Sequence, residues 1–272
     1  MGETVRTMEV DLARLAEGIL LDYDPRDMPP GIELVERDDL VLWTRPSKIF
    51  WMSSVRLARW TAAEAEARID EALAFFRERG RSFVWEVGPS SAPADLADRL
   101  RRRGLEVESD TRLLVARLPV AGLRQVADLR IVDARTVDDV TAYLRFARRE
   151  WEDPEIGDAD VAERMRSFTL YGERMGNVLG YLGAELVANA AWRDSTDGRA
   201  VYLSGAGTLP EHRGKGIYQT LVGYRLERAA ERGCSYAVIQ ARADTSLPIL
   251  LRRGFVEVAQ VPVLMHLEGR PG

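Results

Sequence analysis

The sequence predicts an α/β protein in which helices flank a mixed sheet, built from two related units. Helical and strand-like segments alternate along the 272 residues, an order that is typical of mixed α/β folds. The length is sufficient for two domains. A pattern of the first half also recurs in the second half, which indicates that the two halves share one architecture.

The repeat consists of two matches. Residues 78–83 (ERGRSF) resemble residues 231–236 (ERGCSY), and residues 102–105 (RRGL) resemble residues 252–255 (RRGF). The offsets are 153 and 150 residues, so the two matches are nearly in register. Both halves therefore read as helix, glycine, strand, loop, helix, Arg-Arg-Gly, strand.

This repeat predicts where the chain divides. We expect a first domain over residues 1–120, a linker over 121–128 and a second domain over 129–272. The first domain is expected to be a degenerate copy, and the second to be complete.

The first half begins with an amphipathic helical pattern that stops at the turn Pro29-Pro30-Gly31. Apolar runs rich in branched and aromatic residues then predict strands, and longer patterns of period 3.6 that stop at a glycine predict helices. The expected elements are a helix at 4–21, strands at 40–44 and 49–57, a helix at 61–79, a strand at 82–87, a helix at 94–103, and one or two strands over 106–118.

The same criteria give the elements of the second half. An acidic loop separates its first two helices, and a hairpin follows them. The expected elements are a strand at 129–133, helices at 137–150 and 161–170, strands at 178–182, 185–192 and 199–208, a helix at 218–232, a strand at 236–240, a helix at 246–253, and strands near Val256 and Val263.

Composition limits the classes of function. The net charge of −5 argues against a general nucleic-acid binder, and no apolar run is long enough to cross a membrane. Cys234 is the only cysteine, and His212 and His266 are the only histidines, so we expect no disulfide and no metal site. With no signal-like N-terminus, a cytoplasmic location is expected. The oligomeric state is left open between monomer and homodimer.

Residues 207–218 (GTLPEHRGKGIY) carry the clearest chemical signal. They connect a strand-like run to a helix-like run, so several backbone N–H groups are expected to be free at the start of the helix. Such donors and the positive end of the helix dipole suit a phosphate or pyrophosphate. The glycines allow a close approach to the backbone, and Arg213 and Lys215 add positive charge. The simpler interpretation is a solvent-exposed turn, but the flanking pattern on both sides favours a binding site.

Two other phosphate motifs do not fit this turn. A Walker A loop requires glycine and Ser or Thr at positions that are here Leu209 and Gly216. A dinucleotide fingerprint requires Gly-x-Gly-x-x-Gly, but Gly205-Ala206-Gly207 is followed by Pro210 at the third glycine position.

The turn resembles the acetyl-CoA-binding signature of the GNAT-type N-acetyltransferases: a strand, a proline, then Arg-Gly-x-Gly opening a helix. Residues 210–217 (PEHRGKGI) carry the match, and Gly254-Phe255 fits the end of a late helix of that family. The element order from residue 129 onward is also similar. The resemblance covers about half of the chain, and the first half resembles a degenerate copy, as in tandem members of the family.

The resemblance implies which residues bind the cofactor. The backbone of the strand end pairs with the pantetheine arm, and the amides at the turn hold the pyrophosphate. The thioester is then expected in a gap between the strands at 199–208 and 236–240. The implied cofactor-binding residues are Gly207, Thr208, Arg213, Gly214, Lys215, Gly216, Ile217 and Tyr218.

The first half differs at the equivalent helix start. Thr61 and Glu64 have the spacing of a capping box, which would satisfy the amides that a phosphate needs. Glu64 would also repel an anion. We therefore expect that the first half does not bind CoA.

The catalytic groups are less clearly marked. The tyrosine that often serves the family as an acid is Leu250 here, and a frequent asparagine is Ala243. Tyr202 and Ser204, on the strand before the turn, are the candidate catalytic residues, because either hydroxyl can orient a water or the thioester. Alternatively, both side chains only fill faces of the sheet.

The acceptor site of the family is lined by the loop between the first two helices of the domain. In this chain that loop holds seven candidates, of which the first, second and fourth are the predicted substrate-binding residues: Glu150, Trp151, Glu152, Asp153, Glu155, Asp158 and Asp160. Acids beside an aromatic ring suit a cationic amine. The alternative is an acidic loop that is simply solvated.

Three functions are compatible with the sequence. The leading hypothesis is an acetyl-CoA-dependent N-acetyltransferase acting on a small, cationic amine. The replaced tyrosine and asparagine leave room for a second hypothesis, a CoA-dependent enzyme with other acyl chemistry or another acyl donor. The third is a non-catalytic protein that binds CoA as a sensor or for interaction.

The cofactor assignment is testable with Gly216→Asp. The added side chain would block the turn sterically and repel the pyrophosphate, so this variant should lose acetyl-CoA binding. Acetyl-CoA at a hundredfold its Kd should stabilise the wild type by about 2.7 kcal/mol, which is read as a rise in melting temperature. If acetyl-CoA still raised the melting temperature of the variant, the assignment would be wrong.

Overall fold

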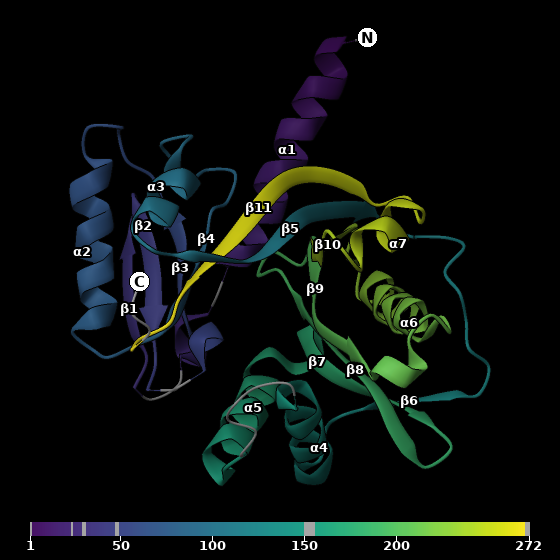
Figure 1. Ribbon diagram of the computed structural model, residues 1–272. Coiled ribbons are helices and arrows are strands. Elements are labelled where there is room, and N and C mark those ends of the chain that lie inside the picture. The colour runs from purple at the N-terminus through teal and green to yellow at the C-terminus, as the bar shows by residue number, and fades with distance from the viewer. Residues whose placement is uncertain (1, 23, 29–30, 47–48, 150–155, 270–272) are drawn as a thin grey trace.

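A computed structural model describes residues 2–22, 24–28, 31–46, 49–149 and 156–269. Its strands form one sheet of eleven, in the order β1-β2-β3-β4-β11-β5-β10-β9-β8-β7-β6. Helices flank this mixed sheet, and Figure 1 shows the two halves of the chain side by side along it. The predicted fold class is confirmed.

The first half follows the expected order of helices and strands with one additional strand, and two short 3-10 helices are added; one of these, at residues 50–52, replaces the start of the strand expected at 49–57. Strand β1 was not anticipated, because its sequence ELVER is mostly charged, which fits its place at the edge of the sheet. The elements are α1 (Gly2–Leu21), η1 (Pro25–Asp27), β1 (Glu33–Arg37), β2 (Leu40–Thr44), η2 (Phe50–Met52), β3 (Ser53–Ala58), α2 (Ala65–Arg77), β4 (Phe83–Glu86), α3 (Leu96–Arg102) and β5 (Glu106–Arg117).

The second half also follows the expected order. The strands expected near Val256 and Val263 are one long strand, β11, whose register shifts twice along its length. The elements are β6 (Leu129–Asp133), α4 (Val137–Arg148), α5 (Asp158–Tyr171), η3 (Gly172–Arg174), β7 (Met175–Leu182), β8 (Glu185–Asp194), β9 (Ala200–Thr208), η4 (Pro210–His212), α6 (Ile217–Glu231), β10 (Tyr236–Arg242), α7 (Leu247–Leu251) and β11 (Val256–His266).

The internal repeat is visible as shared backbone geometry. Gly80 and Gly233 follow α2 and α6, and Gly104 and Gly254 follow α3 and α7. All four have positive φ, between 57° and 91°. Residues with a side chain rarely adopt this conformation, which explains why the repeat keeps glycine at both places.

The last strands of the two halves are exchanged. Strand β5 of the first half pairs with β10 of the second, from Arg117–Tyr236 to Thr111–Arg242. Strand β11 pairs with β4 of the first half and with β5. Figure 1 shows β11, in yellow, crossing from the second unit to the first. The division at residues 121–128 therefore stays a prediction, and each unit is completed by a strand of the other.

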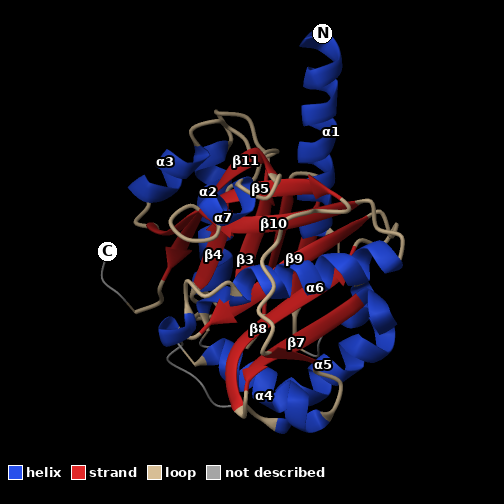
Figure 2. Cartoon of the chain, turned by 90° about the vertical axis from the view of Figure 1, so that its right-hand side faces the viewer, coloured by secondary structure: helices blue, strands red, loops and turns tan. Residues whose placement is uncertain are grey.

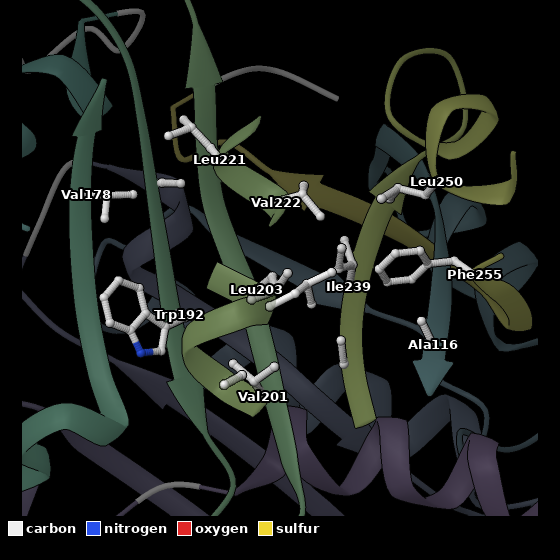
Figure 3. Close-up of a cluster of buried hydrophobic side chains, with 14 of the residues drawn as sticks. Ala116, Val178, Trp192, Val201, Leu203, Leu221, Val222, Ile239, Leu250 and Phe255 are labelled. Carbon is white, nitrogen blue, oxygen red and sulfur yellow. The ribbon is translucent and has the colours of Figure 1, made fainter. Parts of the chain in front are cut away.

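The hydrophobic cores reflect the exchange. Leu114 and Ala116 of β5 are buried in the core of the second half, whereas Leu264 of β11 is buried in the core of the first. Figure 3 shows Ala116 in the same cluster as Ile239 of β10 and Phe255, which precedes β11. Neither core is complete without the other half of the chain.

The helices lie on both faces of the sheet. Helix α6 covers one face of the second half, as Figure 2 shows, and α4 and α5 pack on the opposite face. Ala16 and Ile19 of α1 pack on that opposite face as well, against β5, β10 and β11. No described helix, α1 included, combines the length and apolarity needed to cross a membrane.

The strand exchange predicts how fragments behave. A fragment of residues 129–272 lacks β5 and β4, so β10 and β11 lose strands that they pair with and Ala237 and Ile239 lose core neighbours. We expect no cooperative thermal unfolding transition for this fragment alone. Co-expression with residues 1–128 should restore the transition. A monomeric fragment that unfolds cooperatively by itself would contradict the interlocked arrangement.

Candidate active site

Strands β9 and β10 part in the middle of the sheet. They pair in parallel from Ala200–Tyr236 to Leu203–Ile239 and no further, although β9 continues to Thr208 and β10 to Arg242. Along residues 204–208 no described strand pairs with this edge of β9. The edge therefore offers backbone donors and acceptors to a ligand, in the gap that the family resemblance implied.

The other edge of β9 carries a bulge at the same level. Asn189 pairs with Gly207 and Ala191 with Ser204, so one residue of β8 faces two residues of β9. Gly205, in the bulge, has φ +55°, and a Cβ there would lie 3.0 Å from the hydroxyl of Tyr143. Glycine is required at this position both by the backbone and by the close approach of the tyrosine.

A buried guanidinium holds the bulge from the α6 side of the sheet. Nη1 of Arg225 donates to the carbonyl of Ala191 at 2.7 Å and to that of Ser204 at 3.3 Å. Burial lowers the pKa of Arg225 to about 10, so the group is still charged at neutral pH. The bulge is thereby fixed, because the two carbonyls have a strong donor in a buried setting.

The predicted turn leads into an uncapped helix. Gly214 and Gly216 have φ of +77° and +97°, and no side chain caps α6 at Gly216. Arg213 and Lys215 are exposed beside it, and Nε of Arg213 donates to the carbonyl of Thr208. The start of α6 thus has the properties expected of an anion site.

The linker adds a group that the sequence did not predict. Its backbone bonds to the first turns of α6, through Gln219 and Thr220. The side chain of Arg124 lies against Gly216, where a Cβ would be 3.3 Å from its Cδ. Arg253 also reaches this end of the helix, donating to Gln219. Two arginines distant in sequence therefore flank the turn.

The corresponding place in the first half is closed. Thr61 and Glu64 exchange the expected hydrogen bonds between each side chain and the other's backbone N–H. This exchange lies in the turn before α2, because the helix starts only at Ala65 and its N-cap residue, Glu64, receives no side-chain cap. The chain itself occupies the edge of β3, since Ala92 bonds to the backbone of Ala58 and Trp60. No comparable open edge is left there for a pantetheine arm.

A cavity of about 710 Å³ reaches the bulge from the opposite face of the sheet. In the second half the cavity is lined by residues of α4, α5, β8 and β9, and the β9 residues include the bulge at 204–207. In the first half the lining residues come from the end of α1 and from β1, β2 and β3. The first half of the chain thus forms part of the wall of this cavity.

Both predicted catalytic residues line the cavity. Tyr202 and Ser204 lie two positions apart on β9 and share one face. Burial, together with the charge of Glu86, raises the pKa of Tyr202 to about 12, against the opposing effect of Arg56 and Arg193. Tyr202 is therefore a hydrogen-bond donor rather than a base at neutral pH. The catalytic role of the two residues stays a prediction.

Two further polar groups face the bulge. Tyr143 of α4 contacts Gly205, and burial raises the pKa of its hydroxyl. Asn189 of β8 is 2% exposed, and its Nδ2 has no partner among the described residues. A buried amide donor without a partner is costly, and this one adjoins Gly207, whose Cβ would lie 2.9 Å from Oδ1. Asn189 thus keeps a buried amide N–H with no partner among the described residues, next to the bulge.

Sequence reasoning missed these residues, although a signal existed. Asn189 interrupts an apolar strand, and Arg225 stands on the apolar face of α6, four residues after Leu221. A polar residue in an otherwise buried pattern is informative. The predicted acceptor residues Glu150, Trp151 and Asp153 lie outside the described residues. The expected loop ends earlier than predicted, because Asp158 and Asp160 belong to the first turn of α5 and Asp160 is paired with Arg148.

Comparison with known proteins agrees with this geometry. Residues 133–255 match the model of the acetyltransferase (GNAT) family. This part of the chain is a GNAT domain. It contains the parted strands, the bulge and the uncapped helix, and the other unit supplies β5 beside β10.

Solved structures share the fold of the whole chain. A GCN5-related N-acetyltransferase from Kribbella flavida has 21% identity and a TM-score of 0.68, with 96% of each chain covered. A tandem GNAT protein from the clavulanic acid biosynthesis pathway has 14% identity and a TM-score of 0.56, covering 96% of this chain and 94% of that one. No curated protein sequence matches the chain significantly. The fold is therefore that of a tandem GNAT protein.

Proposed function

We propose that the chain is an acetyl-CoA-dependent N-acetyltransferase that acetylates a small amine. One observation carries the proposal: the open edge of β9 leads from the uncapped start of α6 at one end to the cavity at the other. A thioester beside Ser204 and Gly205 would meet an acceptor there, while its pyrophosphate is bound outside the cavity. The family membership of the domain supports acyl transfer.

The residues present fit acetyl-CoA. The amides from Arg213 to Tyr218 would hold the pyrophosphate, with Arg124 nearby, because they start a helix with no side-chain cap. The backbone of Gly207 and Thr208 would pair with the pantetheine arm along the open edge. When bound, the cofactor supplies an activated acetyl group.

The chain's own groups would then orient the reactants. The hydroxyls of Tyr143 and Tyr202 are protonated at neutral pH and would donate hydrogen bonds beside the bulge. Ser204 faces the same space, and Asn189 offers an unused N–H donor. Positioning and hydrogen bonding of this kind suffice for attack by a neutral amine.

We propose Tyr218 as the proton donor to the leaving thiolate. Leu250 is fully buried in the core, so the usual acid position carries no polar group. Tyr218, on the first turn of α6, lies near Ser246 at the start of α7 and is within electrostatic reach of Arg225, which donates to the carbonyl of Ser204. Burial raises the pKa of Tyr218, which keeps the phenol protonated.

The acceptor is expected to carry a positive charge near the loop that holds Glu150, Trp151 and Asp153. Arg149, which precedes this loop, lies in the wall of the cavity. The cavity volume limits the acceptor, or the part of it that enters, to a small molecule.

The proposal is tested by following release of the CoA thiol across a panel of amines. Cys234 does not interfere, because it is 5% exposed and its burial, with Asp194 nearby, raises its pKa to about 11. Release should require an amine and yield an N-acetyl product by mass spectrometry. Binding without release would favour a sensor, and equal release without an amine would favour other acyl chemistry.

Tyr218→Phe tests the proton donor. Loss of the phenol should lower kcat about a hundredfold, with little change in the dissociation constant of acetyl-CoA measured by calorimetry. Tyr224→Phe is the matched control, because this tyrosine is on the same helix and bonds to Asp133 and Arg228 instead. Equal kcat values for the two variants would refute the role of Tyr218.

A further inference from the structure

One face of α5 lines the cavity. Its residues recur at helical spacing and include two acids, a hydroxyl, a phenol and a guanidinium. They are Asp160, Glu163, Arg164, Ser167 and Tyr171. The surroundings of each group decide whether it is available to a substrate.

The two acids are already paired. Asp160 accepts from Arg148 at 2.7 Å and lies 3.8 Å from Arg45, while Glu163 accepts from Arg45 at 2.8 Å. Although burial acts to raise it, these cations and the amide of Gly157 hold the pKa of Asp160 below its usual range. The negative charge on this face is therefore neutralised within the protein.

The hydroxyl and the phenol are also engaged. Ser167 donates to Oδ1 of Asp27 at 2.6 Å, and the oxygen of Tyr171 accepts from the backbone N–H of Asp24 at 3.1 Å. Both partners belong to the segment after α1. These contacts fix the first half against α5.

Arg164 differs from its neighbours. It is half-buried and lines the cavity, and within the described part of the chain it makes no hydrogen bond, ion pair or ring contact. Burial raises the pKa of both Asp27 and Tyr143, and the charge of Arg164 opposes that rise in each. Its guanidinium is therefore within electrostatic reach of Tyr143, which touches the bulge at Gly205.

From this placement we infer that the acceptor amine also bears a carboxylate, which binds Arg164 while the amine reaches the bulge; amino acids are the substrate class. This inference rests on the proposed function. A planar guanidinium suits the two oxygens of a carboxylate. Arg45 and Arg148, which also line the cavity, are paired with acids, so the charge of Arg164 fits a monoanion better than a phosphate dianion.

The reaction leaves the carboxylate unchanged. The neutral amine nitrogen attacks the thioester carbonyl, an N–C bond forms and the C–S bond breaks. CoA leaves as the thiol after protonation, and the nitrogen loses its proton to solvent. The products are an N-acetyl amino acid and CoA.

Matched pairs of acceptors test this inference on the full chain. L-phenylalanine and phenethylamine, and L-leucine and isopentylamine, differ only in the carboxylate. In at least one pair, we expect kcat/KM to be about ten- to hundredfold higher for the amino acid than for the amine. The difference should lie in KM, and its size is that of one hydrogen bond to a charged group. In Arg164→Gln this advantage should disappear, while Arg164→Lys should restore part of it.

Arg145→Gln is the control, because Arg145 is exposed on α4 outside the cavity and should keep the advantage. If carboxylate-free amines react as well as the amino acids, or if Arg164→Gln lowers both equally, the inference is wrong and the proposed function stands. If no amine of either kind releases CoA, the proposed function fails and the inference fails with it.

Discussion

The contact between Arg225 and the carbonyls of Ala191 and Ser204 is the interaction on which the rest of the site depends. A bulge in the middle of a sheet leaves carbonyls without ladder partners, and in a buried setting this is costly. The guanidinium supplies donors from behind the strand. Strand β9 can then separate from β10 beyond Leu203 while it stays paired with β8, and Gly205 stays close to Tyr143.

The exchange of β5 and β11 joins the two units in one sheet, in which each unit has a different role. The second unit keeps an open strand edge and a glycine turn into α6, whereas in the first unit Ala92 occupies the strand edge and Thr61 and Glu64 exchange hydrogen bonds in the turn before α2. The first unit supplies β5 to the sheet and a wall to the cavity. Its structural role does not depend on binding a cofactor.

Most elements of the fold, and the turn at residues 207–218, could be predicted because their signals are local. Glycines with positive φ, a proline and helical periodicity all act within a few residues. The bulge could not be predicted, because it depends on pairing between β8 and β9 and on Arg225 from a later helix. The strand exchange could not be predicted for the same reason. The sequences of β5 and β11 indicate strands but not which strands they pair with, because pairing depends on long-range packing.

The most direct test of the account is a crystal structure of the protein with CoA. We expect the pyrophosphate on the amides from Arg213 to Tyr218, and the sulfur between β9 and β10 at the level of Ser204. The bulge, Arg225 and Tyr143 should keep their present contacts. CoA bound at Thr61 in the first half, or a sulfur away from the parted strands, would contradict the account.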